Sequence, residues 1–138
     1  MENLKYEDLE FIYYESDSDY ETKYKIDDSE VNIVLKSYNN DYENIIKKAY
    51  EFLKNFNLED IKSLIVKECY LADKKELESV HNREISEELY RKLLKLTTIA
   101  FGDKFIDIWF DDSNLYGGHS FNLSKKYEGD VYNIDLAG

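Results

Sequence analysis

The spacing of apolar residues changes twice along this chain, and this change constrains the fold more than any other feature. Apolar and polar side chains alternate between residues 20 and 35, apolar ones recur every three or four positions between 45 and 94, and alternation returns after 96. Alternation is typical of a half-buried strand, and the longer period is typical of an amphipathic helix. The pattern predicts an α+β fold with helices packed on an antiparallel sheet.

Three strands are expected before the helices. They span residues 9–15, 20–26 and 31–37, and clusters of turn-forming Ser and Asp separate them. Short turns between alternating segments favour antiparallel pairing, so this part is predicted to be a three-stranded meander.

Two or three helices should follow. Asn39, Asn40 and Asp41 are N-cap candidates for a helix that extends to residue 56, a second helix begins near Asn57, and Ser86 can cap a third. Residues 73–82 are charged and weakly patterned, so the end of the second helix is not defined by the sequence.

The C-terminal part is predicted to form a hairpin, a further strand over 117–124 and a short edge strand over 132–136. Gly102-Asp103 suits a type II′ turn, which would place Ile99 opposite Ile106 and leave Leu96 beside Trp109 on the other face. Phe105 and Trp109 give the hairpin a second apolar face. We expect the rest of the chain to cover that face; the alternative is an exposed patch that binds a partner or forms a homodimer.

Composition points to one domain in the cytoplasm. The length of 138 residues suits a single core, spanning residues 1–138. The chain has one cysteine, no apolar run of membrane-spanning length and no basic segment followed by an apolar one near Met1. We therefore expect no internal disulfide and no membrane segment, and leave open whether the protein is a monomer or a homodimer.

Several chemistries lack their residues. Five glycines, one cysteine and two histidines cannot supply a phosphate-binding loop, a dinucleotide fingerprint or a zinc knuckle. No catalytic residue or cofactor is assigned. Asp17-Ser18-Asp19 resembles half of a calcium loop, but the other spaced ligands and the closing glutamate are missing, so a turn is predicted. His81 is expected to be solvated, and Cys69 to be buried and inert.

The negative charge is concentrated at the start of the chain. The net charge is -12, and the first 30 residues hold 11 acids against three lysines. Such a field repels nucleic acid and attracts basic proteins. Tyrosines that supply contact area at low entropic cost lie among these acids. The predicted partner-binding residues are Tyr13, Tyr14, Glu15, Asp17, Asp19 and Tyr20.

A second candidate site lies near the end of the chain. Asp111, Asp112 and His119 could bind a divalent metal or act as a base and its orienting group, as in a metal-dependent hydrolase. The alternative is structural, because an Asp-Asp-Ser-Asn sequence also suits a turn and His119 alternates with Phe121 and Leu123.

The run IDIWFDDSNLYGGHSFNL, followed by Glu-Gly-Asp and a closing Leu-Ala-Gly, resembles an uncharacterised family of bacterial domains. The signature residues are Asp111, Asp112, Leu115, Tyr116, Gly118, His119 and Ser120. Many relatives have glycine where this chain has Ser113-Asn114. Such domains resemble immunity-type proteins encoded beside polymorphic toxins, and the family has no established catalytic residues. The resemblance therefore implies a non-enzymatic protein that covers the active cleft of a basic toxin.

Overall fold

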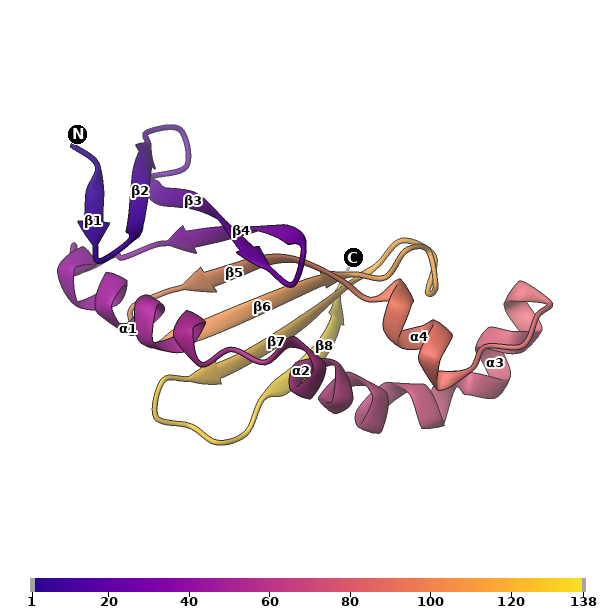
Figure 1. Cartoon of the computed structure of the whole chain (residues 1–138). Helices are drawn as coiled ribbons and strands as arrows, with labels where there is room; N and C mark the ends of the chain where they lie inside the picture. Colours follow the sequence, from indigo (N-terminus) through magenta and orange to yellow (C-terminus); the bar gives the residue numbers. More distant parts are fainter. Residues whose placement is uncertain (1, 138) are drawn as a thin grey trace.

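The computed structural model describes residues 2–137, which form one eight-stranded sheet with helices on one face (Figure 1). The strands lie in the sheet in chain order, and every neighbouring pair is antiparallel except β4 and β5, which are parallel. The prediction of an α+β fold is confirmed. The strands are β1 (Leu4–Tyr6), β2 (Leu9–Tyr14), β3 (Asp19–Ile26), β4 (Ser29–Leu35), β5 (Lys95–Phe101), β6 (Phe105–Asp111), β7 (Ser120–Lys126) and β8 (Asn133–Ala137).

All described helices lie in the connection between β4 and β5. A π-helical turn (Val66–Tyr70) joins α2 to α3 without a break, and α3 projects beyond the end of the sheet (Figure 1). Only Leu77 of α3 is buried, which is why its sequence shows little helical periodicity. The helices are α1 (Tyr42–Lys54), α2 (Leu58–Ile65), α3 (Leu71–His81) and α4 (Glu87–Leu93).

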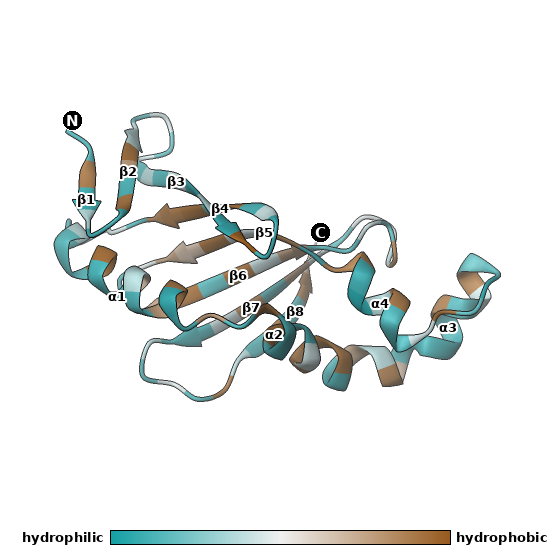
Figure 2. Ribbon diagram, viewed as in Figure 1, coloured by the Kyte–Doolittle hydropathy of each residue, from teal (hydrophilic) through white to brown (hydrophobic). Residues whose placement is uncertain are grey.

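The core lies between the helices and the sheet face turned toward them. Every second residue of the central strands is buried there, and α1 contributes one apolar stripe. Figure 2 shows this segregation, with hydrophobic segments on the strands and as bands on α1. The most fully buried residues include Phe11, Ile33, Leu35, Ile45, Tyr90, Ile99, Phe101, Phe110 and Phe121.

The opposite face of the sheet carries none of the described helices. Phe105 is 43% exposed there and Trp109 is half-buried. The expectation that the chain covers both faces of this hairpin is therefore wrong. The reason is topological: the helices belong to one connection between two adjacent strands, and they pack together on one side.

The β5–β6 hairpin differs from the prediction in register. Gly102 N–H donates to the Phe105 carbonyl at 2.9 Å, so Asp103 and Lys104 form the loop and Phe101 pairs with Ile106. A type II′ turn with Gly102 first would require a positive φ at Gly102, which it does not have.

A register shift between Leu96 and Thr98 further changes which face β5 presents. Leu96 pairs with Phe110 and is buried in the core, rather than lying beside Trp109 on the other face. An extra residue in one strand reverses the side-chain alternation beyond it. This irregularity was not predicted because the alternation of apolar residues in this short segment fits a regular strand equally well.

The N-terminus of α1 is anchored to the β5–β6 loop. Asp41 occupies the predicted N-cap position, but its side chain does not cap the helix. Instead, Ser37 Oγ accepts a hydrogen bond from Asp41 N–H and donates to Asp103 at 2.5 Å, and Tyr38 N–H donates to the other Asp103 oxygen at 2.9 Å. These two hydrogen bonds to Asp103 lower its pKa, and the bond from the Ser37 side chain has a larger effect than the bond from the Tyr38 backbone.

Replacing Asp103 with asparagine should modestly lower the melting temperature at neutral pH. A carboxylate whose pKa is lowered by folding stabilises the protein at pH values above its ordinary pKa of 3.8. This stabilisation is lost as the pH falls through the pKa of the folded state. The difference between Asp103→Asn and the wild type should therefore shrink in acid, as measured by thermal unfolding across pH. Asp28→Asn, at an exposed turn, is the control. A difference that does not vary with pH would contradict the assignment.

Candidate functional site

The β2–β3 hairpin contains the six residues predicted to bind a partner. Tyr14, Glu15 and Asp17 are exposed, as predicted for a contact surface, and Tyr13 is half-buried. Ile12, which the sequence did not single out, is 51% exposed and shares a strand face with Tyr14. We call the exposed surface formed by Ile12, Tyr14, Glu15 and Asp17 the hairpin tip.

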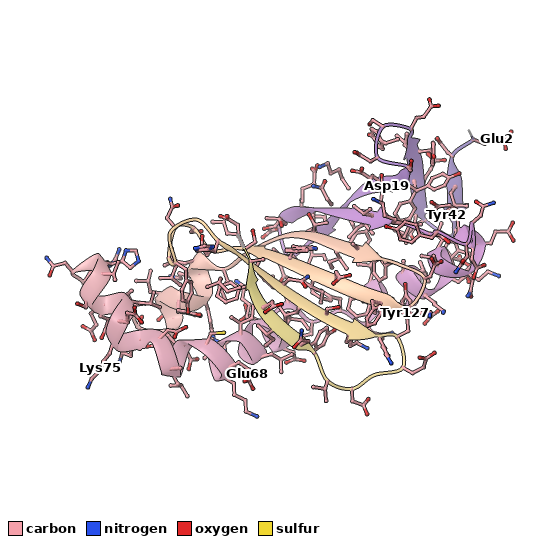
Figure 3. All side chains as sticks on the ribbon, turned by 180° about the vertical axis from the view of Figure 1, so that it is seen from behind. Glu2, Asp19, Tyr42, Glu68, Lys75 and Tyr127 are labelled. Atoms are coloured by element: carbon pink, nitrogen blue, oxygen red, sulfur yellow. The ribbon has the colours of Figure 1, made fainter. Side chains whose placement is uncertain are left out.

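Asp19 and Tyr20 do not belong to that surface. Each is only 5% exposed, which corrects their predicted role as contact residues. The Tyr20 ring packs edge-on between Tyr13 and Tyr42, with centroid distances of 5.0 and 4.8 Å. The Tyr42 hydroxyl lies 3.4 Å from the Ser37 carbonyl and 3.5 Å from the Ser18 carbonyl, either of which can accept its proton, so Tyr42 places α1 against the hairpin. Figure 3 shows Asp19 and Tyr42 together at this end of the molecule.

Three carboxylates converge behind the hairpin tip. One oxygen from each of Asp17, Asp19 and Glu21 lies within 4.8 Å of the others. Asp19 Oδ1 is buried and has no hydrogen-bond partner among the described residues. Burial raises the pKa of Glu21, and the adjacent Asp19 carboxyl, within hydrogen-bonding reach, raises it further.

Such a cluster is electrostatically unfavourable when all three groups are ionised. Two unit charges 4 Å apart repel by roughly 4 kcal/mol at an effective dielectric constant of about 20. Lys23 only partly offsets this, and its ammonium group also bonds Asn32 Oδ1. A proton or a cation would relieve the repulsion. The sequence predicted a turn at Asp17-Ser18-Asp19 and no metal-binding role for Glu21, although the spacing Asp-x-Asp-x-Glu carries the signal.

Asp112 is the centre of the loop that contains the signature residues. Its side chain is fully buried and accepts three backbone hydrogen bonds, from Asn114 at 2.9 Å, Tyr116 at 2.9 Å and His119 at 3.0 Å. These bonds use both carboxylate oxygens, so Asp112 already has a structural role.

The other members of the proposed hydrolase site do not gather around a common point. Asp111 is exposed, and the hydrogen bond between His119 and Asp112 comes from the His119 backbone N–H. Among residues 2–137, the metal-compatible group of three or more side chains is the one at the hairpin. Gly117 and Gly118 have φ of +87° and +88°, a conformation that favours glycine. Gly118, His119 and Ser120 thus lead from the loop into β7.

This loop also anchors the projecting helix. The Tyr116 hydroxyl donates to Asp73 of α3 at 2.7 Å and lies 2.8 Å from the Tyr90 hydroxyl of α4. His81 Nε2 lies 2.7 Å from the Leu115 carbonyl and must donate its proton there. The expectation of a solvated His81 is therefore wrong: the ring is half-buried and holds α3 against the loop.

Cys69 lies in the π-helical turn. The side chain is half-buried rather than buried as predicted, and this partial burial raises the pKa of its thiol to about 11. The thiol form therefore dominates at neutral pH, in keeping with the prediction of low reactivity.

Replacing Asp112 with asparagine should lower the free energy of unfolding by about 2 kcal/mol, since at least one buried N–H loses its acceptor. Urea denaturation monitored by circular dichroism measures this. Asp111→Asn, at the adjacent exposed acid, should change stability by less than about 0.5 kcal/mol. Equal effects of the two substitutions would show that Asp112 does not organise the loop.

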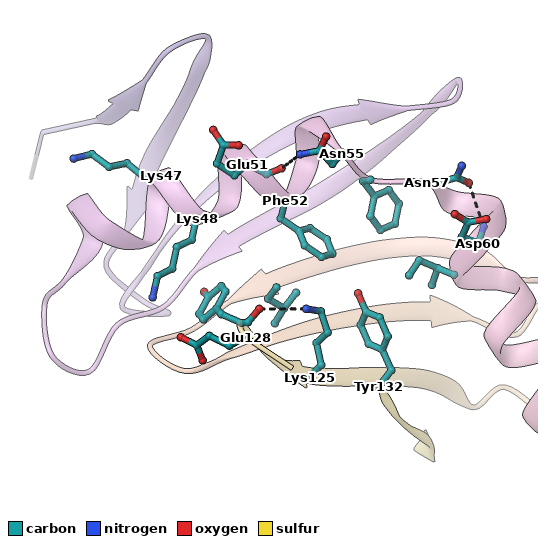
Figure 4. A pocket seen from close by; sticks show the side chains of 14 residues that line it. Lys47, Lys48, Glu51, Phe52, Asn55, Asn57, Asp60, Lys125, Glu128 and Tyr132 are labelled. Atoms are coloured by element: carbon teal, nitrogen blue, oxygen red, sulfur yellow. Dashed lines mark hydrogen bonds between the residues drawn. The ribbon is translucent and has the colours of Figure 1, made fainter. Parts of the chain in front are cut away.

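A groove of about 680 Å³ lies between the α1–α2 segment and the β7–β8 loop (Figure 4). Its size suits a small ligand. Phe52 and Ile106 supply apolar surface, and Tyr127 and Tyr132 line the loop side; burial raises the pKa of Tyr132 to about 12.

Two of the three lysines that line the groove, Lys125 and Lys48, have protein partners. Lys125 Nζ donates to the Gly129 carbonyl at 3.0 Å and to the Tyr127 carbonyl at 3.4 Å, which shapes the loop. Lys48 Nζ lies 4.5 Å from the centroid of the Tyr127 ring, a cation–π contact. The groove is therefore a weaker candidate than the hairpin, where a buried carboxylate oxygen is unpaired.

Comparison with protein-family models, curated proteins and solved structures finds no match to this chain. Within the described part of the chain, no helix combines the length and the apolar character needed to cross a membrane.

Proposed function

We propose that this protein is a cytoplasmic binding protein, immunity-like in its action, which recognises a basic partner through the hairpin tip. The observation that carries the proposal is a group of exposed acids beside exposed apolar side chains at one end of the sheet. A toxin with a basic active cleft is the kind of partner that this surface fits. The protein would block that cleft by occupying it, without performing chemistry.

The ion pairs support this proposal because they lie elsewhere. Among residues 2–137, the three ion pairs all use Arg91 or Lys92, whose partners are Glu59, Glu87 and Glu88. None includes an acid of the hairpin, so the charge of Glu15 and Asp17 remains free to attract a cationic surface. Charge of this kind mainly accelerates association.

The helix-free face of the sheet supplies further contact area. Ile12 pairs with Glu21, which in turn pairs with Val34, so the exposed face of β2 continues across the sheet. Phe105 lies further along the same face. A specific interface needs about 800 Å² on each partner, and this face extends the contact surface beyond the four residues of the tip.

Reversing two charges at the tip should slow association at low salt by at least about tenfold, because electrostatic steering contributes roughly 10–1000-fold. The variant is Glu15→Lys with Asp17→Lys, since Asp19 is too buried for reversal. The matched control is Glu68→Lys with Glu76→Lys, which changes the net charge equally at exposed positions of residues 66–81, a segment that we call the helical arm. Figure 3 shows Glu68 of this arm away from Asp19 and Tyr42.

The partner is first captured from a lysate of the source cell, and surface plasmon resonance then gives its association rate over a salt series. We expect a basic partner whose association slows with added salt for the wild type and for the control. Salt-insensitive binding, or equal slowing in both double variants, would refute recognition through the tip.

A second candidate is a homodimer joined through the helix-free face. The exposure of Ile12 and Phe105 on that face favours it. In that case the wild type should sediment as a dimer in analytical ultracentrifugation and Phe105→Glu as a monomer. Lys104→Glu, at the adjacent loop, should leave the dimer intact. A monomeric wild type at about 100 µM would exclude this candidate, since dimers with Kd near 1 µM would be fully formed.

A further inference from the structure

We infer that Asp17, Asp19 and Glu21 form a calcium site in the β2–β3 hairpin. The proposal does not depend on the proposed function, because the ion binds this chain alone. It rests on two independent observations: the convergence of three carboxylates, and an unpartnered oxygen on the most buried of them.

The backbone explains why these side chains converge. Asp19 and Glu21 are two residues apart on β3, so they project from the same face of the strand. Asp17 lies in the preceding turn, where Asp17 N–H and Ser18 N–H donate to the carbonyls of Tyr14 and Glu15, each at 3.3 Å. This turn brings the Asp17 carboxylate to within 4.8 Å of the other two.

Asp19 is the residue that distinguishes this cluster from an ordinary acidic surface. Its side chain is 95% removed from solvent, and Oδ1 accepts no hydrogen bond from the described protein. A buried carboxylate oxygen normally has a partner, yet none of the ion pairs among residues 2–137 includes Asp19. One oxygen of the Asp19 carboxylate lies within 4.8 Å of oxygens of Asp17 and Glu21, so this buried group is part of the cluster.

The ligand set selects the class of ion. The three groups offer only carboxylate oxygens, which suit hard cations such as calcium, magnesium and manganese rather than zinc or copper. Calcium tolerates irregular geometry and six to eight oxygen ligands, whereas magnesium requires a near-ideal octahedron and gives up its water reluctantly. Because the site is an open turn with three side-chain ligands, calcium should bind more tightly than magnesium. The affinity should resemble that of weak sites, with Kd on the order of 0.1–1 mM.

Bound calcium would connect the turn to the strand. Asp17 precedes β3 and Glu21 lies within it, so one ion held by both restrains the tip of the hairpin. Hydrogen exchange of the amides of residues 15–21 should slow when calcium is added, while exchange in the helical arm should not change.

The direct test is isothermal titration of the full chain with calcium chloride after removal of divalent ions with a chelator. We expect one ion per chain, together with a melting temperature that rises with calcium concentration. Glu21→Gln and Asp17→Asn should each weaken binding at least tenfold, and circular dichroism would establish that both variants are folded. Asp28→Asn, an acid in the next hairpin turn, removes the same charge outside the cluster and should bind like the wild type.

Two results would overturn the site. One is that the folded wild type binds neither calcium, magnesium nor manganese when each ion is supplied at a concentration about 10-fold above the upper expected Kd. The other is an equal loss of affinity in Asp28→Asn and Glu21→Gln, which would mean that calcium only screens the acidic surface. Because no partner protein is present, failure here leaves recognition through the hairpin tip to its own test.

Discussion

The parallel pairing of β4 with β5 is the interaction on which the rest of the structure depends. It joins two antiparallel halves, β1–β4 and β5–β8, into one sheet, with Ile33 opposite Ile99 and Leu35 opposite Phe101 in the centre of the core. Lys36 N–H extends the pairing with a 3.0 Å bond to the Phe101 carbonyl. A parallel pair needs a long crossover, and this one contains every described helix. The helices therefore cover one face of the sheet and leave the other open.

Charge is separated along the molecule as a consequence of this arrangement. Bases in the crossover find partners there: Lys62, whose pKa is lowered by burial, donates to the Arg91 carbonyl at 2.9 Å, and Arg91 bonds Glu59 and Glu87. The acids of the β2–β3 hairpin take part in none of the ion pairs among residues 2–137. A surface that combines unpaired acids, exposed apolar side chains and a buried unpaired carboxylate is suited to binding a cation or a cationic protein.

The segment from Asp111 to Ser120 has a structural explanation that its sequence did not provide. Asp112 gathers three backbone N–H groups, and the loop that it shapes offers the Leu115 carbonyl and the Tyr116 hydroxyl to α3 and α4. An acidic pair followed by Gly-Gly-His is equally compatible with a metal site. The two interpretations differ only in where the carboxylate oxygens point, which no spacing in the sequence specifies.

The residues of the hairpin show how far the sequence could lead to the candidate site. Composition and turn chemistry identified Tyr14, Glu15 and Asp17 as exposed and acidic, because local turn residues and strand alternation depend on near neighbours. They could not reveal that Asp19 is buried, because its burial comes from tertiary packing and its own side chain favours the surface. They also gave no role to Tyr42, which reaches the hairpin only because α1 crosses the sheet.

By itself the sequence determined the class of fold, most of the strands and helices, and the concentration of acid at one end, since all of these follow from local spacing and composition. Tertiary structure decided the order of the strands, the parallel pair at the centre and the face that remains open. It also placed the Leu96 irregularity and the partner of His81. These features depend on contacts between residues far apart in the chain, whose free energy comes from burying apolar surface and satisfying backbone groups together.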